Sequence, residues 1–177
     1  HRVNPPLGGP MHWSRLVDLP IAAMILIFRP LAGQALAEVI ACVTVPMMTF
    51  AVICFSMFAS LRGFLGNGRA LLAIALLVTT FPILTQLAPL RIDHHGWQIT
   101  MAVGLLGGML HPDARRGGWI MGLSMALWMH ISSEGLPYAA ITGAVLALRH
   151  AARAEEWPRL IRYAEAMAGG SALLLLA

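Results

Sequence analysis

The sequence predicts an all-α polytopic membrane protein: a transmembrane helix bundle of about five full spans, with a truncated span and an interfacial helix. Hydrophobic residues occupy 58% of the 177 positions, 11% are charged, and the mean hydropathy is +0.74. Soluble domains carry about 25% charged residues, so this composition is typical of membrane proteins. All 12 basic residues are arginines, dispersed through short loops. This dispersal is typical of membrane orientation signals and does not indicate nucleic-acid binding.

Residues 1–33 are expected to form an external loop and an interfacial helix. The segment 11–28 is amphipathic at first and wholly apolar after Pro20. Its apolar part is shorter than the ~20 residues that a spanning helix needs, so we expect it to lie along the membrane interface. Arg29-Pro30 is expected to end this helix, because proline lacks a backbone donor and disfavours helix in the residue before it.

Residues 34–177 are expected to form the helix bundle, with polar or proline-containing turns between apolar runs. The expected spans cover residues 34–61, 70–87, 96–110, 119–131 and 138–148, a truncated span begins near Ala166, and the basic segment 149–162 is expected to be a loop. Two runs contain glycines four apart, Gly104 with Gly108 and Gly118 with Gly122, a pattern that lets helix backbones approach closely. Because the sequence starts without methionine and stops inside an apolar run, we interpret it as an internal or N-terminal-half fragment of a larger protein.

The arginines also predict an orientation. Eight of the 12 fall in one set of turns and the remaining four in the other. Positively charged loops stay on the cytoplasmic side. The N-terminal loop and the loops that contain Asp93 and Glu134 are therefore expected to face outward together.

The densest polar cluster lies at residues 91–98, Arg-Ile-Asp-His-His-Gly-Trp-Gln, between two apolar runs. Ionisable groups at a membrane boundary are costly to desolvate, so the cluster is a functional-site hypothesis. Asp93, His94 and His95 offer a carboxylate and two imidazoles, which suit manganese, magnesium or zinc. The alternative is structural: Asp93 caps the following helix and the histidines lie among lipid headgroups.

Further polar residues are expected on the same side. Glu134, within Ser-Ser-Glu-Gly at 132–135, is a candidate catalytic or acceptor-binding carboxylate, or else a solvated turn residue. Arg15 is suited to a bidentate contact with phosphate, and Trp13 is suited to stacking on a sugar. The alternative for both is that they anchor an interfacial helix.

Asp93-His94-His95, between two spans on the expected outer side, resembles the second external loop of membrane glycosyltransferases of the C superfamily. Archaeal-type oligosaccharyltransferases are the most similar in this loop. The resemblance covers residues 91–98 and implies that Asp93 and His95 bind a divalent metal, Mn²⁺ or Mg²⁺, which engages the phosphate of a lipid-linked sugar. It implies that His94 is a neighbour or a substrate contact, although the residue types alone make all three metal-ligand candidates. It also implies a further acidic ligand upstream of His1. The family commonly has glutamate where this chain has Gln98, which we regard with Arg91 as a candidate substrate-binding residue.

The sequence thus predicts a metal-assisted glycosyltransferase, multi-pass in a bacterial or archaeal cell membrane. It would transfer a sugar or oligosaccharide from a polyprenyl-phosphate donor on the outer face, with Asp93 and Glu134 as the catalytic candidates. Its expected partners are membrane lipid and that donor. Two alternatives stay open: a transporter that relays protons or binds ions through these acids and histidines, and a non-catalytic membrane subunit.

Overall fold

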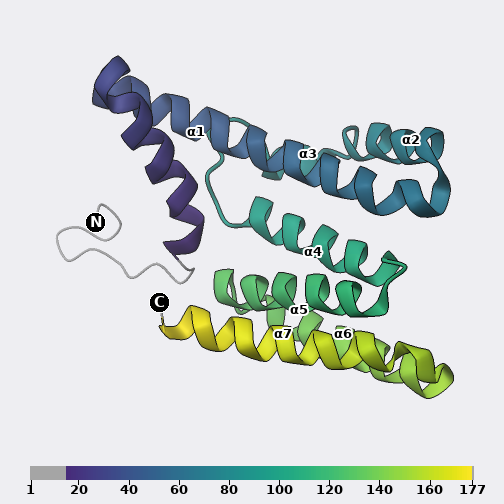
Figure 1. Cartoon of the computed structure of the whole chain (residues 1–177). Coiled ribbons are helices and arrows are strands. Elements are labelled where there is room, and N and C mark those ends of the chain that lie inside the picture. Colours follow the sequence, from purple (N-terminus) through teal and green to yellow (C-terminus); the bar gives the residue numbers. More distant parts are fainter. Residues whose placement is uncertain (1–14, 177) are drawn as a thin grey trace.

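The computed structural model describes residues 15–176, and every regular element in that range is helical, which confirms the all-α prediction (Figure 1). The elements are η1 (Arg15–Asp18), α1 (Leu19–Leu65), α2 (Asn67–Leu77), α3 (Phe81–Gln86), α4 (His95–Leu110), α5 (Ala114–Ile131), α6 (Gly135–Ala152), η2 (Ala154–Glu156) and α7 (Trp157–Leu176).

Helix α1 consists of two arms that meet at Gly33. This residue has φ 75° and ψ 168°, a conformation that glycine adopts without a Cβ clash. Figure 1 shows the purple first arm turning away from the longer second arm. The prediction that Arg29-Pro30 ends the first helix is wrong, because helical geometry continues past Pro30 to the glycine. The break at Gly33 coincides with the predicted boundary between residues 1–33 and residues 34–177. That these two segments form separate units stays a prediction.

The predicted single span 70–87 is wrong, because the chain breaks between α2 and α3. The hydroxyls of Thr79 and Thr80 both donate to the carbonyl oxygen of Leu76, at 2.8 and 3.0 Å. These local bonds favour a turn over a continuing helix. Pro82 then lies in the first turn of α3, where its missing N–H removes no helical hydrogen bond.

The helices pack side by side in the order α1, α4, α5 and α7, with α6 against α5 and α7 (Figure 1). Glycines allow the closest approaches. A Cβ on Gly108 would lie 2.6 Å from the carbonyl oxygen of Gly117, and one on Gly122 would lie 2.5 Å from that of Tyr163. The close packing predicted for Gly108 and Gly122 is therefore confirmed.

Helix α6 continues to Ala152 and helix α7 starts at Trp157, so the predicted loop 149–162 is wrong at both ends and is reduced to residues 153–156. Arg159 lies inside α7 and is only 4% exposed. Its guanidinium donates to the Glu156 carboxylate at 2.8 Å and to the carbonyl oxygens of Gly108 and His111 at the end of α4. Burying an arginine is tolerable when its donors are satisfied in this way.

One helix in the described range, residues 15–65 with η1 included, is long and apolar enough to cross a membrane. The other predicted spans do not reach that threshold. Helix α4 has 16 residues, about 24 Å at 1.5 Å per residue. Arginines within α5, α6 and α7 lower the mean hydropathy of those helices.

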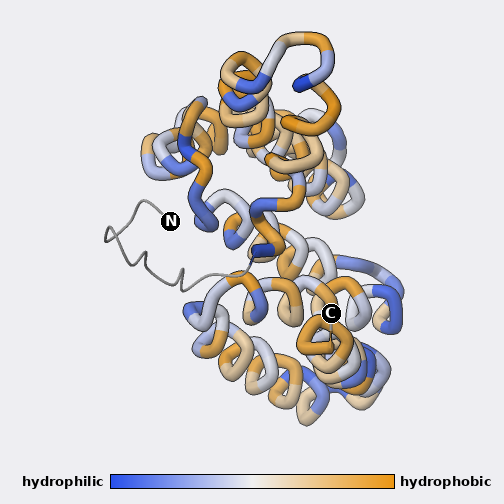
Figure 2. Tube along the Cα trace, turned by 90° about the vertical axis from the view of Figure 1, so that its left-hand side faces the viewer, coloured by the Kyte–Doolittle hydropathy of each residue, from blue (hydrophilic) through white to orange (hydrophobic). Residues whose placement is uncertain are grey.

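Large apolar side chains nevertheless cover much of the helices' exterior. Leu31 is 85% exposed, Phe55 73% and Leu175 78%, on three separate parts of the fold. Figure 2 shows apolar residues along the helices of every layer. An exterior of this kind is unusual for a soluble monomer, in which large exposed apolar patches mark interaction surfaces.

Candidate functional site

The loop between α3 and α4 carries the polar cluster and is fixed against its neighbours. The N–H of Leu90, a residue with positive φ of 71°, donates to the carbonyl oxygen of Cys42 on α1 at 3.0 Å. At the start of α4, a Cβ on Gly96 would lie 2.8 Å from the Leu87 side chain. Glycine therefore lets α4 begin directly against the loop, which places residues 93–95 at the helix N-terminus.

Both carboxylate oxygens of Asp93 have partners in this loop. One oxygen, Oδ2, accepts from Nε of Arg91 at 2.7 Å. The other, Oδ1, accepts from the backbone N–H of His95 at 3.1 Å. Partial burial raises the pKa of Asp93, but the His95 N–H and the Arg91 guanidinium outweigh it and hold that pKa below its ordinary value. Asp93 thus contributes to the start of α4, as its structural alternative predicts, although His94 is the N-cap residue.

The two histidines lie next to each other but in different environments. Their ring centroids are 4.4 Å apart with planes inclined by 31°. The side chain of His94 is 6% exposed and that of His95 is 40% exposed. His94 is therefore directed into the helix bundle, whereas His95 borders solvent.

Glu134 reaches these histidines from the loop before α6. Its Oε2 accepts from Nε2 of Gln98 at 2.7 Å and lies 4.0 Å from Nε2 of His94. One ligand atom from each of His94, His95 and Glu134 falls within 4.8 Å of the other two. In the described part of the chain, Asp93 does not belong to this group of three.

The remaining predicted site residues are distributed unevenly. Arg91 and Gln98 lie beside the group of three. Arg91 donates to Asp93, and Gln98 donates to Glu134. Arg15 is an exposed residue at the start of η1, and no hydrogen bond or ion pair of the described residues joins it to the cluster. Trp13 lies outside the described residues.

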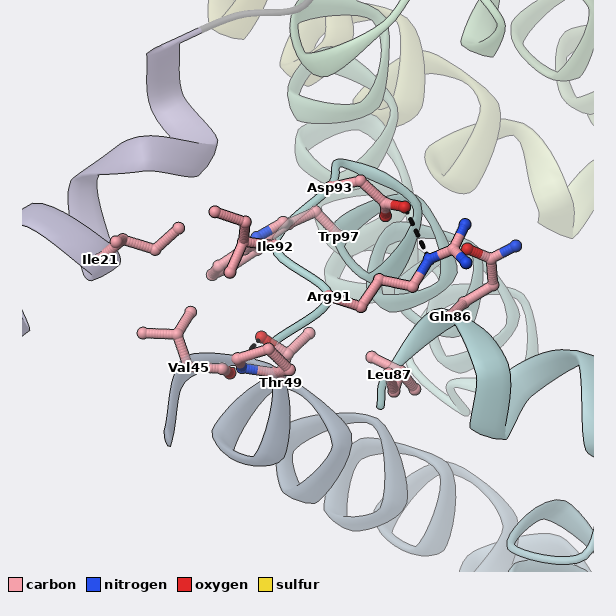
Figure 3. A pocket seen from close by; sticks show the side chains of 11 residues that line it. Ile21, Val45, Thr49, Gln86, Leu87, Arg91, Ile92, Asp93 and Trp97 are labelled. Atoms are coloured by element: carbon pink, nitrogen blue, oxygen red, sulfur yellow. Dashed lines mark hydrogen bonds and ion pairs between the residues drawn. The ribbon is translucent and has the colours of Figure 1, made fainter. Parts of the chain in front are cut away.

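A shallow hollow lies beside the cluster, between the two arms of α1 and the loop before α4. Figure 3 shows Asp93 paired with Arg91 on one side of it, and Ile21, Val45 and Thr49 on the other. The hollow therefore has a charged edge and an apolar wall.

The wall continues into an apolar groove of about 310 Å³. The first arm of α1 lines it with Pro20, Ala23 and Met24, and α4 lines it with Trp97 and Thr100. The second arm of α1 completes the lining with Val45, Met48, Thr49 and Val52. An apolar groove thus opens next to the polar cluster.

The link between Gln98 and Glu134 is the feature that sequence reasoning missed. A usable signal was present: Gln98 follows His94 by four residues, which places both on one face of a helix. The partner of that face, Glu134, lies 36 residues further along the chain, and only packing reveals the pairing.

The three converging residues suit a divalent metal ion. Two imidazoles and one carboxylate leave coordination positions open, as in catalytic sites that bind substrate directly to the ion. Imidazole nitrogen favours Zn²⁺ and is less suited to Mg²⁺, which prefers oxygen ligands. Comparison with protein-family models, curated proteins and solved structures finds no match to this chain.

Proposed function

We propose that this protein is a multi-pass membrane glycosyltransferase that uses a divalent metal ion and a polyprenyl-phosphate-linked sugar donor on the outer face of the membrane. The observation that carries the proposal is the convergence of His94, His95 and Glu134 from the starts of two separate helices, α4 and α6. The resemblance of residues 91–98 to the second external loop of the C superfamily supplies the reaction class.

Membrane insertion of several helices is supported by the apolar exterior and by the arrangement of the turns. The turns α1–α2, α4–α5 and α6–α7 gather at one end, at right in Figure 1, and the site lies toward the other. The first group carries most of the arginines. By the positive-inside rule this end is cytoplasmic and the site faces outward. Helices of 16 to 20 residues span a bilayer that is locally thinned.

The apolar chain and the phosphate of the donor match two adjacent surfaces, the apolar groove and the polar residues at its edge. The polyprenyl chain would lie in the groove between the arms of α1, while its phosphate meets the residues at the groove's polar edge. His94, His95 and Glu134 would hold the ion, and Arg91 presents a guanidinium beside them. Bound there, a divalent ion would act as a Lewis acid on the phosphate leaving group.

The proposal is tested by thermal melting of the intact protein in detergent with a polyprenyl-phosphate sugar. A ligand that binds only the folded state stabilises it by about 2.7 kcal/mol at a hundred times its Kd. We expect the donor to raise Tm with Mn²⁺ present and much less with EDTA. Glu134→Gln should remove the metal-dependent part. Polyprenol without phosphate is the control and should give a smaller shift that EDTA does not change.

A proton-coupled transporter gives the opposite pattern in the same experiment. Its stabilisation by substrate would survive EDTA and change with pH through the histidines. A donor-induced shift that is insensitive to EDTA but lost at one of two pH values would therefore contradict the transferase. Transport sites also usually lie near the bilayer midplane, whereas Glu134 is at a helix end.

A further inference from the structure

The position of Asp93 leads to a more specific assignment, which rests on the metal-dependent function proposed above. Its two carboxylate oxygens are directed at Arg91 and His95. In addition to the backbone bond, Oδ1 lies 3.2 Å from Nδ1 of the His95 ring. The carboxylate therefore contacts one of the three converging residues, but it is not among the three itself.

The ring of His95 is oriented by this contact. Its Nδ1 is shielded from solvent, although the side chain as a whole is 40% exposed. The two atoms are close enough for an ionic contact, although the geometry is not that of an aligned hydrogen bond. With Nδ1 enclosed beside the carboxylate, Nε2 is the nitrogen open to an incoming ion.

We infer that Asp93 is a positioning residue that orients His95, and that the ion's protein ligands are His94, His95 and Glu134. Histidine ligands generally donate their second ring N–H to a carboxylate or carbonyl, which fixes the tautomer and makes the ligating nitrogen more basic. Arg91 fixes the carboxylate in turn, through the 2.7 Å bond to Oδ2. This assignment differs from the resemblance, which implies Asp93 as a direct ligand.

The assignment also selects the class of ion. Two nitrogen donors and one oxygen donor favour Zn²⁺ over Mg²⁺, since imidazole suits zinc and magnesium requires mostly oxygen ligands. If Asp93 were a fourth ligand, the site would have equal numbers of oxygen and nitrogen donors. The nitrogens would come from His94 and His95, and the oxygens from Asp93 and Glu134. Whether Asp93 is a ligand or a positioning residue therefore affects which metal ion the site prefers.

The test is metal binding, measured by calorimetric titration of the intact protein with Zn²⁺ alone. Asp93→Asn keeps an oxygen beside Nδ1 of the His95 ring, so its affinity should fall only a few-fold. Asp93→Ala removes the acceptor and should weaken binding about 10- to 100-fold, the usual range for partners of ligating histidines. His95→Ala removes a ligand and should weaken binding by more than Asp93→Ala does. Arg91→Gln removes the ion pair with Asp93 but keeps the Asp93 carboxylate, so it measures the effect of that pair by itself.

A second readout separates orientation from ligation. Co²⁺ in place of Zn²⁺ gives a visible absorption spectrum that depends on the ligands. Asp93→Ala should leave the spectrum of the bound ion unchanged, whereas Glu134→Gln should alter it. The inference is overturned if Asp93→Asn loses as much affinity as His95→Ala, if Asp93→Ala changes the spectrum, or if Asp93→Ala binds as tightly as the unmodified protein. If the unmodified protein binds no ion, the proposed function and the inference both fail.

Discussion

At the scale of single residues, the Gln98 amide on α4 holds the carboxylate of Glu134. Glu134 is 61% exposed at its side chain, so packing alone does not hold it near the histidines. The bond from Gln98 joins α4 to the loop before α6. The backbone N–H of Glu134 also donates to Ser132 Oγ at 3.3 Å, which shapes the turn.

Replacing Gln98 by methionine tests this dependence. Methionine has a similar length but no donor, so the carboxylate of Glu134 loses its hydrogen bond from α4. We expect Mn²⁺ affinity to fall about 10-fold, the lower end of the range for groups that support metal ligands. Thr100→Val is the matched control on α4, because the Thr100 hydroxyl donates only to Gly96 of its own helix. Equal affinities for the two variants would show that Gln98 does not position Glu134.

Part of this site could be predicted from the sequence. Asp93, His94 and His95 are adjacent in the chain, and the arginine pattern placed Glu134 on their side. The sequence could not predict that Asp93 pairs with Arg91 and leaves Glu134 as the third member of the group. That arrangement depends on the positive φ of Leu90 and on packing between α4 and the loop before α6, neither of which has a sequence pattern.

At the scale of elements, an ion-pair network centred on the buried Glu156 joins the start of α7 to the end of α6. Glu156 accepts from Arg149 and from Arg159, each at 2.8 Å. The hydrogen bond from Arg149 lowers the pKa of Glu156, burial raises it, and Arg159 lowers it further, so that the net pKa lies below the ordinary value. The ionised form therefore stabilises the fold at neutral pH.

Glu156→Gln should destabilise the protein in a pH-dependent way. Removing one partner of a buried ion pair costs about 3 kcal/mol, because the other charge stays buried. A lowered folded-state pKa gives stability that is complete above the unfolded value and is lost as pH falls through the folded value. The difference in unfolding free energy between this variant and the unmodified protein should therefore be complete at neutral pH and shrink as the pH falls below 4.5, the ordinary pKa of glutamate. Chemical denaturation in detergent measures it, and a difference independent of pH would contradict this role.

Glycine contacts between α5 and α7 give a second test at this scale. In Gly122→Ala the new Cβ would lie 2.5 Å from the Tyr163 carbonyl oxygen and from the Ala166 Cβ. We expect a loss of about 2 kcal/mol from overpacking. Gly169→Ala is the control on α7, since a Cβ there meets nothing within 4 Å and alanine favours helix by up to about 1 kcal/mol. Similar melting temperatures for both variants would refute the close packing.

The elements themselves were only partly predictable. Apolar runs located most helices, and the glycine spacing indicated which faces pack closely. The break between α2 and α3 was missed because it depends on the hydroxyls of Thr79 and Thr80, which compete locally with the helix. The helical start of α7 was missed because an arginine in a basic segment suggests an exposed loop. The partners that allow Arg159 to be buried are visible only in the folded structure.

At the scale of the whole molecule, the proposed orientation can be tested by chemical labelling. In a variant without Cys42 and Cys54, a cysteine introduced by Ser133→Cys should react with a membrane-impermeant maleimide in intact cells. One introduced by Asn67→Cys, at the arginine-rich end, should react only after the cells are opened. Reaction at position 67 alone in intact cells would reverse the proposed topology.

The central claim is that His94, His95 and Glu134 bind one metal ion together, and electron paramagnetic resonance of Mn²⁺ with the intact protein tests it most directly. We predict one bound Mn²⁺ ion per chain, with nitrogen hyperfine couplings from imidazole. Both His94→Ala and Glu134→Ala should abolish the bound signal, although the two residues lie on separate loops. A bound ion without nitrogen couplings, or one that Glu134→Ala leaves unchanged, would contradict the claim.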